Sequence, residues 1–314
     1  MNGLIFGLDS LAEHQGFVIT QGTFDGVHGG HDWVLKRVVD LSKQHGVPSM
    51  LITFHPHPRL IVHPNDPSVQ LLTSIEEKAK KVLSKGIDKV LVLEFNEALA
   101  QLDPEEFVKQ ILVEQLKVKA MVVGYDHRFG KNRKGSFEDL LQFSQKYNFE
   151  VDEINARLID DIAVSSTRIR QALMSGDLAT ANKMLGSPYT LSGTVIHGNK
   201  RGRTIGFPTA NLELSEPHKL IPPMGVYAGY VEIEGSDFLA QKFRTMINIG
   251  VRPTVDGTNL SIEAHILDFN SDLYGRKIEL QLCEFLRNEQ KFDGIEALKI
   301  QLASDKIKTL QVLN

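Results

Sequence analysis

The fold is decided by one stretch near the N-terminus, Gly22-Thr23-Phe24-Asp25-Gly26-Val27-His28-Gly29-Gly30-His31. It follows the apolar run at residues 17–20 and precedes a helical pattern that places Val34, Val38 and Leu41 on one face. A glycine-rich loop between a strand and a helix is typical of a βα unit. We therefore expect this stretch to open an α/β domain.

The βα rhythm continues to about residue 155. Further apolar runs occupy residues 50–54, 90–93 and 120–124, and helical patterns separate them. Runs that are apolar on both faces and alternate with amphipathic helices indicate a parallel sheet covered on both sides. Such sheets bind ligands beyond the carboxyl ends of their strands. The sequence thus predicts a doubly wound N-terminal domain with its site at that edge.

The rhythm changes at Gly186-Ser187-Pro188, after two short helical stretches. Beyond this point glycine-rich turns separate the strand patterns 226–233, 245–249, 260–267 and 277–285. This spacing favours a small antiparallel barrel. A final helix from Asp293 is expected to bury Ile295, Leu298 and Leu302. We place the domain boundary between residues 185 and 186, which gives domains 1–185 and 186–314.

Charge and hydropathy exclude several classes of partner. The net charge of −4 argues against a general affinity for nucleic acid, which needs a basic surface. No apolar run approaches the roughly 20 residues that span a bilayer. We expect a cytoplasmic protein with neither nucleic acid nor membrane as a partner.

The loop at residues 22–31 suits the triphosphate of a nucleotide. Its small residues let a ligand approach the backbone, and the free amides at a helix N-terminus attract phosphate. In a nucleotidyl transfer, donors from His28 and His31 would stabilise the charge that develops on the α-phosphate. Two alternatives stay open: ordinary loop histidines, or a metal site that also uses His55, His57 and His63.

A second segment, Ser165-Ser166-Thr167-Arg168-Ile169-Arg170, has hydroxyls at an expected helix start and cations one turn later. It predicts a phosphate site made by Ser166, Thr167 and Arg170 together with free backbone amides. The alternative is a plain helix N-cap.

These two segments resemble the nucleotidyltransferase superfamily, which includes cytidylyltransferases and adenylyltransferases. The wording Gly-Thr-Phe-Asp-Gly-Val-His-x-Gly-His, together with Thr53-Phe54-His55-Pro56-His57-Pro58, is similar to the FMN adenylyltransferase module of prokaryotic bifunctional FAD synthetases. The resemblance implies nucleotide contacts by Gly22, Thr23, Phe24, Asp25, Gly26 and Asp126. Around Asp126 the chain departs from the family pattern, because Tyr125 and His127 stand where Phe or Asn is expected.

The C-terminal half contains the glycine-rich, basic segment 198–211, which ends in Phe207-Pro208-Thr209-Ala210-Asn211. It lacks the spacing and the helix of a Walker A loop, but a basic flap over ATP is physically sensible. We expect the flap to contact ATP through Gly198, Gly202, Thr204, Gly206, Phe207 and Pro208. Thr209 and Asn211 face the same way in an extended stretch and can offer oxygens to Mg²⁺.

Glu263 alternates with the apolar residues Ile262 and Ala264, so it faces either solvent or a ligand pocket. Its context resembles riboflavin kinase, through Gly-x-x-x-Gly-Arg-x-x-Gly-Phe-Pro-Thr-Ala-Asn and the later segments Pro223–Ala228, Asn248–Thr254 and Phe285–Arg287. The resemblance places Glu263 as the general base and Arg287 among the residues that bind the nucleotide.

The resemblance extends from about Gly16 to Leu302. It implies a Rossmann-like adenylyltransferase followed by a six-stranded barrel kinase with a terminal helix. Such a chain would phosphorylate riboflavin with ATP and Mg²⁺ to FMN, and then adenylylate FMN with a second ATP to FAD. Two rival functions are a nucleotidyltransferase with another acceptor and a flavin-binding regulator without turnover.

Overall fold

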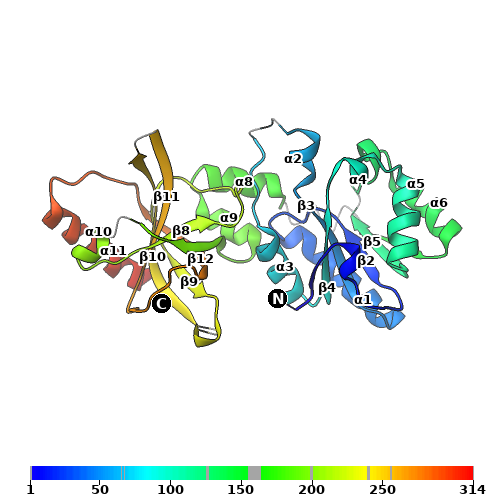
Figure 1. The fold of residues 1–314 in the computed structure, drawn as a ribbon, viewed down its shortest axis with the longest axis horizontal. Coiled ribbons are helices and arrows are strands. Elements are labelled where there is room, and N and C mark those ends of the chain that lie inside the picture. Colours follow the sequence, from blue (N-terminus) through cyan, green and yellow to red (C-terminus); the bar gives the residue numbers. More distant parts are fainter. Residues whose placement is uncertain are drawn as a thin grey trace. The chain divides into compact units, whose positions relative to one another are not determined.

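The computed structural model describes residues 2–64, 66, 68–124, 127–154, 164–198, 201–238, 241–254 and 257–313. The chain forms two compact units (Figure 1), one of Met1–Val69 with Ile75–Ser165 and one of Gln70–Ser74 with Ser166–Asn314. This division precedes the boundary predicted after residue 185. The reason is that α9 (Leu178–Leu185) packs on barrel strands, and α8 (Ser166–Met174) packs on α9.

The first unit is built on a six-stranded sheet with the order β1-β4-β3-β2-β5-β6, in which every pair of neighbours is parallel. Its strands are β1 (Leu4–Phe6), β2 (Val18–Gln21), β3 (Ser49–His55), β4 (Lys89–Glu94), β5 (Ala120–Gly124) and β6 (Glu150–Ile154). The predicted parallel sheet is confirmed. The strand order reverses between β2 and β5, so we expect a ligand to bind beyond the carboxyl ends of these two strands.

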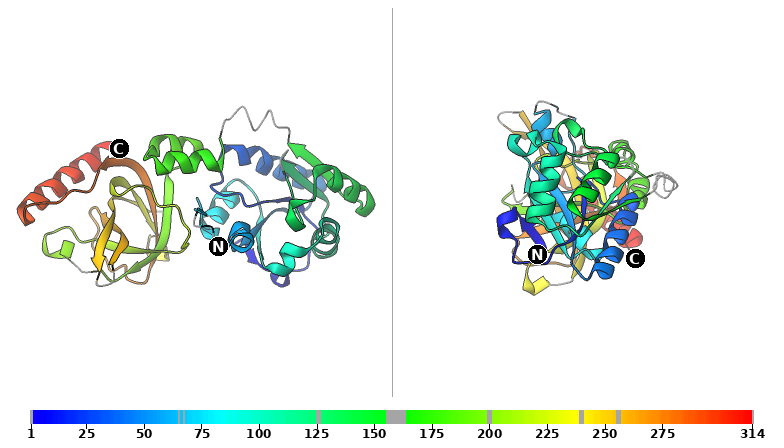
Figure 2. Two further views of the ribbon diagram at one scale, coloured as in Figure 1. Left: turned by 90° about the horizontal axis from the view of Figure 1, so that it is seen from above. Right: turned by 90° about the vertical axis from the view of Figure 1, so that its right-hand side faces the viewer.

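Helices cover both faces of this sheet (Figure 2). They are α1 (Gly29–His45), α2 (Pro58–Val62), α3 (Ile75–Ser84), α4 (Glu97–Gln101), α5 (Pro104–Phe107), which continues as a π-helix (Val108–Gln115), and α6 (Phe137–Tyr147). Val34, Val38 and Leu41 of α1 join α3 in the core on one face, whereas Phe107, Leu112 and Leu140 fill the other. Short 3-10 turns lie at Leu8–Ser10, Lys131–Arg133 and Ser236–Phe238.

The second unit contains a closed antiparallel barrel with the strand order β10-β11-β8-β7-β12-β9. Its elements are β7 (Tyr189–Ile196), α10 (Arg201–Thr204), β8 (Ala210–Leu214), β9 (Gly225–Ile233), β10 (Lys242–Thr254), β11 (Gly257–Ile266), β12 (Lys277–Arg287) and α11 (Ile295–Val312). The predicted six-stranded barrel with a terminal helix is confirmed. Closure leaves no open sheet edge.

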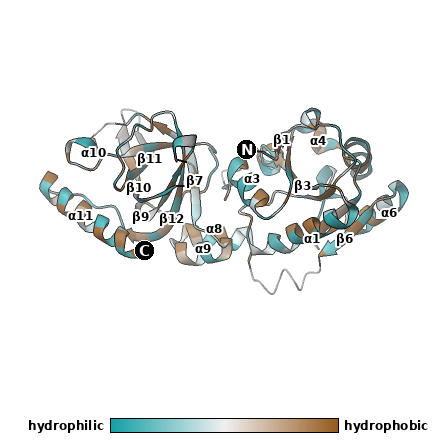
Figure 3. Ribbon diagram, turned by 90° about the horizontal axis from the view of Figure 1, so that it is seen from below, coloured by the Kyte–Doolittle hydropathy of each residue, from teal (hydrophilic) through white to brown (hydrophobic). Residues whose placement is uncertain are grey.

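The terminal helix α11 is held by charge as well as by apolar contact. Arg287 donates from Nε and Nη2 to the carboxylate of Asp305 at 2.7–3.1 Å, and Gln301 Nε2 adds a hydrogen bond of 2.8 Å. Asp305 is completely buried. The expectation that Ile295 is buried is wrong, because it lies at the first turn of α11 and is 60% exposed. Apolar and polar residues intermingle along α11 (Figure 3), and its fully buried positions are Asp305 and Thr309.

Asp305→Ala should destabilise the second unit, because it leaves the guanidinium of Arg287 largely buried without its counter-charge. Removing one partner of a buried ion pair costs about 3 kcal/mol or more in the free energy of unfolding. Urea denaturation measures the loss. Glu296→Ala is the control, since the ion pair of Glu296 with Lys299 lies at the surface of the same helix and should contribute no measurable stability. Equal effects of the two substitutions would contradict a structural role for the Arg287–Asp305 pair.

Candidate active sites

The loop between β2 and α1 lies at the point where the strand order of the sheet reverses. Its backbone has positive φ angles at Phe24 (45°), Gly26 (89°) and Val27 (47°). This region is rare for residues other than glycine and strained for a β-branched valine, and such strain concentrates at ligand sites. Phe24 and Val27 are buried, so their packing holds the loop in this conformation. The loop is therefore ordered before any ligand binds.

His28 and His31 lie side by side at the start of α1, as the spacing predicts. Their rings stack with centroids 3.9 Å apart, and the backbone N–H of His28 donates to Nδ1 of His31 at 3.3 Å. Because Nδ1 of His31 accepts this bond, the proton of a neutral His31 ring is assigned to Nε2. His31 thus keeps one N–H donor for a ligand.

His31 is neutral at physiological pH. Burial lowers its pKa well below 6.5, and the nearby His28, Lys78 and Lys85 lower it further. A neutral imidazole still donates a hydrogen bond from its N–H. A neutral His31 can therefore donate a hydrogen bond to a ligand at pH 7.

The residue pattern did not single out Lys78, although it contributes positive charge to this site. The side chain lies on α3, is 4% exposed, and donates from Nζ to Thr53 Oγ1 at 3.2 Å. Thr53 Oγ1 in turn donates to the carbonyl oxygen of Thr23 in the loop at 3.5 Å. A signal exists in the sequence, because Lys78 interrupts the apolar stripe of Ile75, Ala79 and Val82. Lysine is rarely buried at such positions.

His31 should make the folded protein less stable as the pH is lowered. The unfolded chain takes up a proton on this ring near pH 6.5, whereas the folded protein, with its lowered pKa, does not. The unfolded state thus binds more protons below that pH, and stability is lost as the pH falls. Thermal unfolding between about pH 7.5 and pH 5 should show a larger drop for the wild type than for His31→Gln. His63→Gln, at an exposed histidine, is the control and should behave as the wild type; equal drops for wild type and His31→Gln would refute the assignment.

The remaining N-terminal residues are placed as follows. Gly22, Thr23, Asp25 and Gly26 belong to the same loop, and a Cβ on Gly22 would lie 3.0 Å from the ring of Phe24. Asp126 lies outside the described residues. Within the described part of the chain, no three His, Cys, Asp or Glu side chains come together as a metal site. His57 instead caps α2, where its Nδ1 accepts from the N–H of Arg59 at 3.2 Å.

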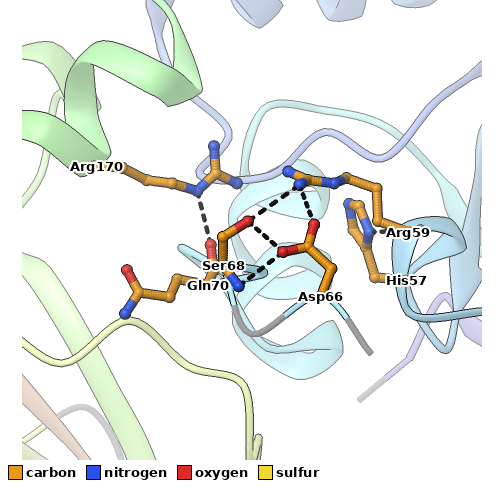
Figure 4. A network of polar contacts seen from close by, with 6 residues as sticks. All are labelled: His57, Arg59, Asp66, Ser68, Gln70 and Arg170. Carbon is orange, nitrogen blue, oxygen red and sulfur yellow. Dashed lines mark hydrogen bonds and ion pairs between the residues drawn. The ribbon is translucent and has the colours of Figure 1, made fainter. Parts of the chain in front are cut away.

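Ser166 and Thr167 form the first turn of α8, and Arg170 lies one turn later. Nε of Arg170 donates to the carbonyl oxygen of Gln70 at 2.6 Å (Figure 4). α8 belongs to the second compact unit, whereas the histidine loop belongs to the first. The assignment of Ser166, Thr167 and Arg170 to phosphate binding therefore stays a prediction.

In the barrel, the structure brings together Glu263, Thr209 and Asn211. Glu263 pairs in register with Asn211 of β8 on one side and with Asn248 of β10 on the other. Thr209 donates from Oγ1 to Oε2 of Glu263 at 2.9 Å. Glu263 is half-buried while its neighbours Ile262 and Ala264 are buried, so it lies on the opposite face of β11. Glu263, Thr209 and Asn211 thus form a row of polar side chains that combines a carboxylate with a hydroxyl and an amide group.

The flap before β8 is folded closely onto this row. A Cβ on Gly198 would lie 2.2 Å from Asn211 Nδ2, and one on Gly202 would lie 2.2 Å from the carbonyl oxygen of Phe207. Only glycine fits at these two positions without displacing its neighbours. Gly206 has a φ of 85°, and Thr204 ends α10.

His265 was also not singled out from the sequence as a site residue. Its Nδ1 lies 2.7 Å from the carbonyl oxygen of Pro208, which can only accept, so Nδ1 carries a proton. Burial is the main cause that lowers the pKa of His265. The contact fixes the end of the flap on β11. Arg287, by contrast, has its guanidinium on Asp305, so its expected role in nucleotide binding stays a prediction.

Both units thus have the features of nucleotide-dependent group-transfer enzymes: a glycine-rich loop at the switch point of a parallel sheet, and a carboxylate beside a glycine-rich flap. Family profiles agree with this class. Residues 10–168 match FAD synthetase and residues 185–313 match riboflavin kinase. The chain belongs to the family of bifunctional riboflavin kinases/FMN adenylyltransferases, and the predicted family and module order are confirmed.

Relatives match along nearly the whole chain. The bifunctional riboflavin kinase/FMN adenylyltransferase of Listeria monocytogenes is 41% identical over 93% of this chain and 91% of its own. That of Escherichia coli K12 is 39% identical over 97% and 96%. A crystal structure from Streptococcus pneumoniae, described as a macrolide-efflux protein, superposes with a TM-score of 0.80 at 31% identity over 98% of both chains. None of the helices among the described residues has the length and apolar character to cross a membrane.

Proposed function

We propose that the chain makes both flavin cofactors from riboflavin. The C-terminal module transfers the γ-phosphoryl group of ATP to riboflavin and gives FMN. The N-terminal module transfers AMP from a second ATP to FMN and gives FAD and pyrophosphate. The family match of both modules supports these reactions, and the observation that carries the assignment of roles is the 2.9 Å contact between Thr209 and Glu263. Both steps consume ATP, and we expect them to occur in the cytoplasm.

In the kinase site, Glu263 accepts the proton of the riboflavin 5′-hydroxyl as that oxygen attacks the γ-phosphorus and ADP leaves. Thr209 donates to Oε2 of Glu263, which orients the carboxylate of this strand residue for its role as proton acceptor. This contact also turns the lone pairs of Thr209 Oγ1 away from Glu263. Together with the side-chain oxygen of Asn211, they are the hard oxygen donors that Mg²⁺ prefers. The ion would neutralise the charge of the ATP phosphates.

Glu263→Gln should lower FMN formation by at least about 100-fold, because the amide cannot accept the proton. Adenylylation of supplied FMN should be unchanged. The measurement is a time course with riboflavin, ATP and Mg²⁺ in which the flavins are separated by chromatography, and the wild type should show FMN before FAD. Glu213→Gln, at an exposed position of β8, is the control. Riboflavin phosphorylation near the wild-type rate in Glu263→Gln would refute the base assignment.

In the adenylyltransferase site, a phosphate oxygen of FMN attacks the α-phosphorus of ATP and pyrophosphate leaves. A phosphate monoester has its second pKa near about 6 and is ionised at pH 7, so no general base is needed. This agrees with the neutral state of His31. His28 and His31 donate to the developing charge, Lys78 adds a buried cation, and the loop 22–26 supports the phosphates. Ser166, Thr167, Arg170 and Asp126 complete the nucleotide contacts.

The double substitution His28→Ala with His31→Ala should reduce FAD formation by about 100-fold or more, since removal of a single preorganised donor already costs that much. Riboflavin phosphorylation should persist. Both rates are measured on the same folded preparation, and His63→Ala is the control. Retained FAD synthesis in the double variant would exclude the two histidines, and loss of both reactions would contradict two separate sites.

Compact units and functional modules do not coincide in this assignment. We assign residues 1–185 to the adenylyltransferase and residues 186–314 to the kinase, as the sequence predicts. α8 carries the proposed triphosphate ligands Ser166, Thr167 and Arg170 of the first module, yet it packs within the second compact unit.

A further inference from the structure

A short strap, Gln70–Ser74, belongs to the second compact unit although its neighbours along the chain belong to the first. The chain therefore changes unit after Val69, after Ser74 and again after Ser165. The strap thus lies within residues 1–185 but belongs to the compact unit that contains the barrel. None of its residues was assigned a role in either reaction.

Three successive carbonyl oxygens of the strap accept hydrogen bonds from the rest of the second unit. Gln70 O accepts from Arg170 Nε at 2.6 Å, Leu71 O accepts from the N–H of Leu220 at 2.8 Å, and Leu72 O accepts from Lys219 Nζ at 2.7 Å. The N–H of Leu71 also donates to His218 O at 2.7 Å, which completes a parallel bridge. Both outer donors are cations, and hydrogen bonds from charged donors are stronger than neutral ones.

Lys219 is the central residue of this arrangement. It is 5% exposed, and its Nζ lies 4.7 Å from the centre of the Tyr189 ring in addition to its bond to Leu72. The hydroxyl of Tyr189 donates to Leu220 O at 2.7 Å. The side chain of Lys219 and the backbone on either side of it therefore hold the strap through separate bonds. A buried lysine in this position requires such partners, because burial of an unpaired cation is costly.

Arg170 depends on the strap for its orientation. The guanidinium is planar, so a fixed bond at Nε sets the plane in which the two terminal nitrogens lie. That bond goes to Gln70 O (Figure 4). Leu71 and Leu72, the next two residues of the chain, are held by Leu220 and Lys219. A shift of the strap would thus move or tilt the guanidinium of Arg170.

The chain just ahead of the strap is fixed as well. Asp66 accepts from Arg59 Nη2 at 2.7 Å and from the N–H of Ser68 at 2.9 Å (Figure 4). These bonds lower the pKa of Asp66 to about 2, and the bonds from Ser68 have a larger effect than the bond from Arg59. The carboxylate is ionised throughout the physiological range, so the anchor does not weaken with ordinary changes of pH. The strap is therefore restrained from its N-terminal side within the first unit.

We propose that Lys219 is a positioning residue for FMN adenylylation, although it lies in the kinase sequence. It fixes the strap, and the strap orients Arg170 for the triphosphate of the ATP that donates AMP. The inference rests on the proposed function, which assigns Arg170 to that triphosphate. It adds a residue of the other module to the adenylyltransferase reaction.

The test compares Lys219→Met with the wild type in the full-length chain. Misplacement of a binding group by about 1 Å can reduce a rate 100-fold, so we expect the KM for ATP in FAD synthesis to rise at least about tenfold. The KM for ATP in riboflavin phosphorylation should stay within about twofold of the wild type. Lys219→Arg, which retains a cationic donor, should restore much of the loss. Lys242→Met, at an exposed lysine of β10, is the matched control.

A double-mutant cycle separates positioning from a general loss of structure. In an Arg170→Ala background, Lys219→Met should raise the KM for ATP no further, because the group that it positions is absent. Multiplying effects, or a parallel loss of both reactions, would overturn the inference. Should Lys219→Met fail to fold, Lys219→Gln tests the same contact with a shorter neutral donor. A wild-type KM for ATP in FAD synthesis in that variant would equally overturn the inference.

The same assays distinguish this inference from the function on which it rests. A wild-type protein that makes no FAD from FMN overturns the proposed function, and the inference falls with it. A wild type that makes FAD, together with a Lys219→Met variant that matches Lys242→Met, overturns the inference alone.

Discussion

The tight connection from β2 to α1 is the constraint on which the first unit depends. It must turn the chain from the centre of the sheet into a helix while leaving the helix N-terminus open to a ligand. Positive φ angles at Phe24 and Val27 achieve this, and the burial of both side chains compensates for the strain. The ring of Phe24 also lies 4.6 Å from that of His31, so the packing that holds the loop also positions a proposed donor. The same packing therefore stabilises the loop and sets the geometry of the proposed site.

In the second unit, the geometry depends on buried charged side chains. Closure satisfies its backbone, but α11 is fixed by a buried ion pair in which both cation and anion are needed. The same unit holds Lys219 through a hydrogen bond from Nζ to the carbonyl oxygen of Leu72 and through the ring of Tyr189. Such sites tolerate no neutral apolar replacement without leaving a polar partner unsatisfied. Three cations of this unit, Arg170, Lys219 and Arg287, therefore have geometry that is set by specific partners rather than by solvent.

Apolar patterns in the sequence predict the fold well where strands are buried on both faces, as at residues 50–54 and 120–124. They miss β1, which has three residues, and also β6, β7 and β8. In β7 a glycine interrupts the pattern, and Gly193 is required there because a Cβ would meet Glu213 O at 1.9 Å. Motifs predict the histidine loop and the group of Thr209, Asn211 and Glu263. They do not reveal Lys78, Lys219 or the engagement of Arg287 with Asp305. Those contacts join segments far apart in the chain, and helical or strand periodicity carries no information about such partners.

The strap makes the two modules harder to separate than their order in the sequence indicates. A cut after residue 185 would leave Arg170 with Gln70 in the N-terminal piece but remove Lys219 and Leu220, which hold the next two carbonyls. Of the four hydrogen bonds described above, the strap would then keep only the one from Arg170 to Gln70. Fusion of the kinase to the adenylyltransferase therefore does more than keep two enzymes of one pathway together. Through a buried lysine it also gives the adenylyltransferase part of its own scaffold.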